Sequence, residues 1–181
     1  MKDRPNKNEG GYIFAYMYYI IDKPALLESI KEEVSHVADE AYSEDGAALY
    51  DSVMVTDRDK ARLERFIDDA VSQFVRREFD ITKYSPETYT DEFGEVQLSD
   101  RMRLQFFVPD FDETMAEIEN NTITGGALKK ELDRYIVLFS VASLFQQRRV
   151  ALVPEYNTRT QSAMDKAVSL LKFRKHPVTQ W

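Results

Sequence analysis

The chain has no cysteine, only two histidines and a shortage of basic side chains. Without cysteine there are no disulfides and no thiolate metal ligands, so the pattern of a disulfide-stabilised secreted domain is absent. The 24 basic residues are outnumbered by 32 acidic ones, which gives a net charge of -8. Phosphate binding requires an excess of lysine and arginine, so we expect no sequence-specific binding to nucleic acid. The 181 residues, 43% of them hydrophobic, are enough for one core.

Motifs of the common enzyme and nucleotide-binding families are also missing. There is no phosphate loop, dinucleotide fingerprint, nucleophile elbow or His-Glu-x-x-His motif. Glu33 and His36 have the Glu-x-x-His spacing of di-iron bundles, but the chain has no second copy, so an ordinary exposed histidine is the simpler interpretation. Adjacent acids such as Asp68 and Asp69 point about 100° apart on a helix and do not converge. We therefore expect no enzymatic activity, and no catalytic, cofactor-binding or metal-binding residues.

The N-terminal part contains a short aromatic run behind a polar start. Residues 1–11 are expected to form a flexible tail, and the run covers residues 12–21. It is far shorter than the ~20 residues of a membrane-spanning helix, and it lacks a signal-peptide cleavage pattern. We therefore expect a cytoplasmic protein without a membrane segment. Both alternating faces are apolar, as in a strand buried on both sides, although a short buried helix fits as well. The run belongs either to the core or to an arm that completes a neighbouring subunit.

Four longer segments have the periodicity of helices. They cover residues 23–42, 57–79, 127–149 and 155–174. Asp22 can cap the first, and Thr56 with Asp59 forms a variant of the capping box at the second. The third is apolar nearly all the way round its middle, so it must be surrounded by protein. The fourth is one-sided and ends in basic residues, which suit the negative end of a helix.

Between residues 84 and 112 the spacing of apolar residues changes to the two-residue period of a strand. The turn sequence from Asp91 to Gly94 separates two short strand patterns, and residues 101–109 alternate as a further strand. Residues 113–120 are expected to form a short helix. The sequence therefore predicts a mainly α protein: a helical bundle of four main helices with a small β-hairpin or strand insertion at 84–112. We expect a single domain over residues 12–176, followed by a C-terminal tail at 177–181.

Aromatic side chains near the ends of the chain and in the insertion are the candidates for contacts with other proteins, because aromatic residues are enriched at interfaces. The predicted interface residues are Tyr12, Phe14, Tyr16, Tyr18, Phe107, Phe111 and Trp181.

Residues 56–80 and 132–174 resemble tailed-phage head–tail connector proteins, which are small, mostly helical adaptors that form a ring beneath the portal. The shared pattern is a capped helix after Thr56, an apolar helix ending in Arg148 and Arg149, a short link, and a final helix with Tyr156 near its start. The resemblance covers somewhat over a third of the chain. The aromatic N-terminal run and the 84–112 insertion depart from it.

The resemblance implies a non-enzymatic virion protein of a phage or prophage. It implies self-association into a ring that forms on assembly. It also implies contact with portal and tail proteins and a position along the DNA channel, where an acidic wall keeps DNA mobile. The implied location is the virion and, during assembly, the cytoplasm of the bacterial host. Two other classes stay open: a non-viral helical protein-interaction module, and a metal-dependent enzyme that uses Glu33 and His36.

Overall fold

The computed structural model describes residues 14–45, 54–77, 80–109 and 118–171. Within these ranges the chain forms four α-helices and a five-stranded mixed sheet. The helices are α1 (Lys23–Asp45), α3 (Lys60–Arg77), α4 (Gly126–Arg148) and α5 (Val153–Leu171), with short 3₁₀ turns at Asp57–Asp59 and Val150–Leu152. The strands are β1 (Phe14–Asp22), β2 (Asp80–Thr90), β3 (Val96–Pro109), β4 (Ile118–Glu119) and β5 (Thr122–Ile123). The prediction of a mainly α bundle with a small β insertion is wrong, because this is an α/β fold.

The sheet has the order β2-β3-β1-β5-β4, so the N-terminal run lies at its centre. β1 pairs antiparallel with β3 along its whole length, from Phe14 opposite Pro109 to Asp22 opposite Arg101, and parallel with β5. The run is thus a strand, and it pairs with strands of its own chain. Segments that the sequence treats separately, the N-terminal run and the 84–112 insertion, become one structural layer. This pairing between distant segments is the physical reason for the error in fold class, since local periodicity does not reveal it.

The face of β1 toward the helices supplies part of the core. Met17, Tyr19 and Ile21 alternate along the strand and are all buried, whereas Tyr18 and Ile20 lie on the other face and are half-buried. Leu104 of β3 and Ile123 of β5 join the same buried cluster. The two-residue period of a strand therefore separates a fully covered face from a more open one.

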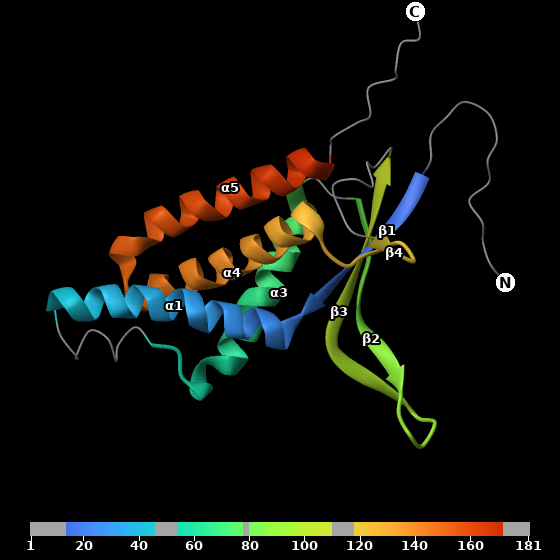
Figure 1. Ribbon diagram of the computed structural model, residues 1–181, viewed down its shortest axis with the longest axis horizontal. Helices are drawn as coiled ribbons and strands as arrows, with labels where there is room; N and C mark the ends of the chain where they lie inside the picture. Colours follow the sequence, from blue (N-terminus) through green and yellow to red (C-terminus); the bar gives the residue numbers. More distant parts are fainter. Residues whose placement is uncertain (1–13, 46–53, 78–79, 110–117, 172–181) are drawn as a thin grey trace, which may run out of the picture.

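The four helices form the other part of the molecule, with α4 in contact with α1, α3 and α5 (Figure 1). Residues 135–138 of α4 are consecutive and all buried, so every side of the helix is covered there. The expectation that this apolar helix is surrounded by protein is confirmed within the chain's own fold. The other three long helix predictions also agree with the structure to within a few residues. The backbone N–H of Ala25 donates to the Asp22 carboxylate at 3.2 Å, as expected of a cap.

The link between α3 and α4 is a buried ion pair. Asp59 accepts hydrogen bonds from the backbone N–H of Thr56 at 2.9 Å and from the Thr56 hydroxyl at 3.0 Å, which confirms the predicted capping interaction. The Arg148 guanidinium donates to the same carboxylate at 2.6 Å and to the Met54 carbonyl at 2.8 Å. Burial by itself raises the pKa of Asp59, but these hydrogen bonds outweigh it and hold the pKa below its usual range.

A second, short hairpin replaces part of the helix predicted at 113–120. Residues 110–117 lie outside the described ranges, but Ile118–Glu119 is strand β4 and pairs with β5. Asn120 and Asn121 make the two-residue turn with φ of 50° and 62°, a left-handed conformation that asparagine tolerates. The carbonyl of Asn121 accepts a hydrogen bond from the backbone N–H of Tyr18 at 2.8 Å, which ties this turn to β1.

Candidate protein interface

The long β2–β3 hairpin extends away from the helices, past the other strands of the sheet (Figure 1). Its base is fixed by Tyr84 of β2, whose hydroxyl donates to the Asp68 carboxylate of α3 at 3.0 Å. Lys23, at the start of α1, approaches the same carboxylate at 2.8 Å. Burial, and then the charge of Asp68, raises the pKa of Tyr84, so this hydroxyl stays protonated and keeps donating. The hairpin therefore projects from a base that is hydrogen-bonded to α3, and α3 is in turn paired with α1.

Two further tyrosines join elements in the same way. The Tyr19 hydroxyl of β1 donates to Asp133 of α4, and the Tyr156 hydroxyl of α5 donates to Glu33 of α1 at 3.0 Å. Arg159 pairs with Glu33 at 2.6 Å and lies 4.7 Å above the ring of Tyr156. Burial is the largest cause of the raised pKa of both tyrosines, followed by the charge of the carboxylate. These contacts join β1 to α4 and α5 to α1, so hydrogen bonds between side chains connect the helices with the sheet that carries the hairpin.

The turn of the hairpin is built around Asp91. Its backbone N–H donates to the Glu95 carbonyl at 2.9 Å, and its carbonyl accepts from the N–H of Gly94 at 3.1 Å. Its carboxylate accepts from the N–H groups of Phe93 and Glu95 and from the side chain of Gln97, at 2.9 to 3.0 Å. The hydrogen bond from Glu95, then that from Gln97, holds the pKa of Asp91 below its usual range. Gly94 has φ of 81°, the left-handed position that follows a tight turn in three-residue hairpin loops. The turn predicted at residues 91–94 is confirmed.

The end of this hairpin, residues 89–98, is called the hairpin tip below. It exposes large apolar side chains: 54% of Tyr89, 82% of Phe93, and 71% of both Val96 and Leu98. Thr90 pairs with Val96 and Thr88 with Leu98, while Tyr89 pairs with Gln97. Directly paired residues share a face of the ribbon, and successive residues alternate. Val96 and Leu98 therefore lie on one face, Tyr89 lies on the other, and Phe93 stands at the turn.

The charge of the hairpin tip is uniformly negative. Asp91, Glu92 and Glu95 lie within it, and it contains no lysine or arginine. Clustered exposed apolar side chains on a soluble protein mark sites of interaction. A ribbon that is apolar on both faces is suited to insertion between two surfaces, because lying on one surface would leave its other face in water. The tip is therefore a candidate interface for a partner that offers apolar side chains and positive charge.

The residues predicted as interface from the sequence are only partly placed. Three of the seven lie outside the described ranges: Tyr12, Phe111 and Trp181. Three others lie in the paired strands β1 and β3, and the structure describes only their backbone: Phe14, Tyr16 and Phe107. Tyr18 is on the open face of β1, where the Arg103 guanidinium lies 4.7 Å from its ring centre. The four predicted residues that the structure describes lie in β1 and β3, outside the hairpin tip, where the exposed apolar side chains lie.

Sequence reasoning included the hairpin in a predicted insertion but missed Tyr89, Phe93, Val96 and Leu98. Their signal was present, because apolar residues flank a turn sequence in a stretch that otherwise carries charge. Strand alternation normally buries one such face. Only the structure shows that neither face at the tip is covered.

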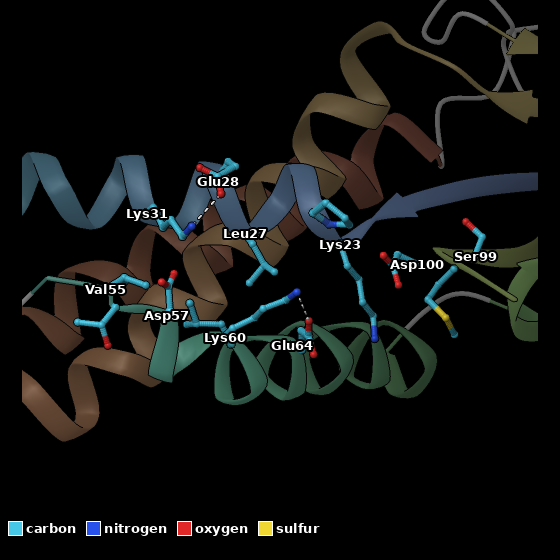
Figure 2. Close-up of a pocket in the computed structure, with 14 residues that line it drawn as sticks. Lys23, Leu27, Glu28, Lys31, Val55, Asp57, Lys60, Glu64, Ser99 and Asp100 are labelled. Carbon is cyan, nitrogen blue, oxygen red and sulfur yellow. Dashed lines mark hydrogen bonds and ion pairs between the residues drawn. The ribbon is translucent and has the colours of Figure 1, made fainter.

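A groove lies between α1, the start of α3 and β3 (Figure 2). It has a volume of about 500 Å³, and Leu27, Leu63 and Met102 form part of its lining. Its lysines already have acidic neighbours: Lys31 pairs with Glu28 at 2.8 Å, and Lys60 lies 3.9 Å from Glu64 (Figure 2). Histidine and cysteine do not line the groove.

Glu33 and His36 share a smaller hollow of about 300 Å³ with Arg159 and Asp133. Glu33 is engaged by Tyr156 and Arg159, and His36 is exposed. Among the described residues, histidine and carboxylate side chains form no group of three that could hold a metal ion. The pair thus provides no support for the di-iron alternative within this part of the chain.

No helix within the described residues is long and apolar enough to cross a membrane. Comparison of the chain with protein-family models, with curated proteins and with solved structures finds no match. Its function is therefore argued from its own residues.

Proposed function

We propose that the protein is a structural subunit of the head–tail connector type, which assembles on a phage or prophage portal and extends the DNA channel. The observation that carries the proposal is the hairpin tip, a projecting ribbon with exposed apolar side chains on both faces. A subunit that presents such a ribbon is suited to assembly, because insertion of the tip into a neighbour removes apolar surface from water.

The resemblance to connector proteins supports the same proposal. The segments that carry it correspond to α3, α4 and α5, which pack together through α4. The excess of acidic residues suits a wall along which DNA must slide without binding. Within the described residues the hydrogen-bonded tyrosines and carboxylates join structural elements to one another. These groups hold the helices and strands in position relative to one another.

The test is co-expression with the portal protein encoded in the same gene cluster, followed by negative-stain imaging and mass photometry. We expect ring-shaped particles that contain both proteins. A chain that stays monomeric beside its portal would overturn the proposal. A gene neighbourhood without portal, capsid and tail genes would also overturn it, in favour of a non-viral interaction module.

Variants of the hairpin tip locate the contact. The double substitution F93S/L98S removes two exposed apolar side chains and should abolish the rings without lowering stability. V150S is the matched control, because Val150 is also 70% exposed but lies between α4 and α5, away from the hairpin. Equal effects of the two variants would show that the tip is not the contact.

A further inference from the structure

The hairpin tip requires a partner that combines apolar side chains with positive charge. Three carboxylates surround Phe93 within residues 89–98, and the whole chain has a net charge of -8. A generic surface of a second copy would therefore repel the tip. The edge of β2 does not offer a simpler route through strand addition, because Pro86 and two register shifts interrupt its pairing pattern. The partner is therefore expected to be a segment that carries both apolar and basic side chains.

The most basic stretch of this chain has that composition. No acidic residue follows Asp165, and the last sixteen residues include Lys166, Lys172, Arg174 and Lys175. The aromatic residues Phe173 and Trp181 lie in the same stretch. The other long acid-free run, residues 134–154, is largely buried in α4 and cannot serve.

We propose that residues 172–181 of one copy bind the hairpin tip of a second copy. The basic side chains face the three carboxylates, and the aromatic side chains pack on Phe93, Val96 and Leu98. The inference rests on the proposed function, since it names the contact that links neighbouring subunits. Figure 1 shows the C-terminal end of α5 at the top of the view and the hairpin tip at the bottom, which favours contact between copies over contact within one.

The contact joins two different surfaces of the same chain, so it is heterologous. Repetition of a heterologous contact generates a ring when the rotation closes. A ring is the arrangement that a connector subunit needs, and a two-fold contact between identical patches would stop at a dimer.

Photo-crosslinking of the full chain tests the contact. Phe93 is replaced by p-benzoylphenylalanine, which its 82% exposure permits, and this protein is mixed with ¹⁵N-labelled wild type. We expect mass spectrometry to find crosslinks from position 93 of one isotopic form to residues 172–181 of the other. The inference would be overturned if crosslinks formed only within one isotopic form of the protein. It would also be overturned if they reached another region of the chain, or if none formed.

Charge reversal provides an independent test by sedimentation velocity. E92K/E95K and K172E/R174E/K175E should each weaken self-association at least about tenfold, and their combination should restore it. E32K/D69K is the matched control, because Glu32 and Asp69 are exposed acids on α1 and α3 and the change in net charge equals that of E92K/E95K. An unchanged association of both reversed variants, or no restoration in the combination, would refute the contact.

The two proposals fail in distinguishable ways. Rings on the portal without crosslinks from position 93 to residues 172–181 would overturn this inference alone. Such crosslinks between copies, without rings on the portal, would overturn the connector proposal.

Discussion

Removal of the Asp59 carboxylate should produce one of the largest losses of stability among single polar substitutions in this protein. In the Asp59→Ala variant, the Arg148 guanidinium loses its hydrogen bond to this carboxylate, and so do the N–H and hydroxyl of Thr56. The Asp59 side chain is 7% exposed and that of Arg148 is 19% exposed, so water replaces these hydrogen bonds poorly.

The size of the effect follows from this burial. Removing one partner of a buried ion pair costs roughly 3–5 kcal/mol, because the other charge stays buried without compensation. Arg148 retains some contact with water and its hydrogen bond to the Met54 carbonyl, which places the estimate at the lower end. We expect the free energy of unfolding to fall by about 3 kcal/mol.

Urea unfolding followed by far-ultraviolet circular dichroism measures this change, since the four helices, among them the two beside the ion pair, contribute strongly to the signal. Asp57→Ala is the matched control, because Asp57 is an exposed acid two residues earlier in the same turn. It should change the free energy of unfolding by no more than about 0.5 kcal/mol. The double variant D59A/R148M should be more stable than D59A alone, because the uncompensated charge is gone.

The pH dependence gives a second measurement of the same interaction. The pKa of Asp59 is lower in the folded than in the unfolded chain, so its stabilising contribution is present above the unfolded value of about 3.9 and is lost as pH falls through the folded value. Wild type should lose more stability than D59A over that acidic range. The reasoning would be refuted if the free energies of unfolding of D59A and D57A differed by less than about 1 kcal/mol and D59A lost as much stability at low pH as wild type.

Four further outcomes are expected. Ser140→Ala should raise the free energy of unfolding by about 1 kcal/mol, because this buried hydroxyl has no hydrogen-bond partner among the described residues; a loss on calorimetry would contradict this. Gly94→Ala should lower the free energy of unfolding by about 1 kcal/mol, and Gly94→Asn by less, because the φ angle of 81° strains a side chain while the space around the position is open. Equal losses of the two variants in urea titrations would argue against backbone strain. Tyr156→Phe should cost about 1 kcal/mol through the lost hydrogen bond to Glu33, and no change in thermal unfolding would exclude that contribution. The backbone amide signals of the hairpin turn should titrate with Asp91 below pH about 3.9 in nuclear magnetic resonance spectra, since its pKa is lowered and the turn hydrogen bonds persist above that value; a midpoint above it would contradict the geometry.

The sequence predicted the local elements well and the candidate interface poorly. The helix periodicities, the capping role of Asp59 and the turn at residues 91–94 follow from short-range rules, and all are confirmed. The exposed residues of the hairpin tip were not singled out, because exposure of both faces depends on what else packs beside the strands. Aromatic content directed the prediction instead to Tyr16 and Phe107, which pair with each other in β1 and β3.

The sequence by itself determined the helices and their order, because the three- and four-residue spacing of apolar side chains fixes which face of each helix is buried. It also determined that α4 must be enclosed, since apolar residues nearly all the way round its middle leave no polar face there. Only the tertiary structure decided that β1 joins the hairpin strands in one sheet, because the pairing of β1 with β3 connects residues 79 or more positions apart. The same pairing decided the fold class. It also left the hairpin tip beyond the reach of the neighbouring strands, which is why its apolar side chains are exposed.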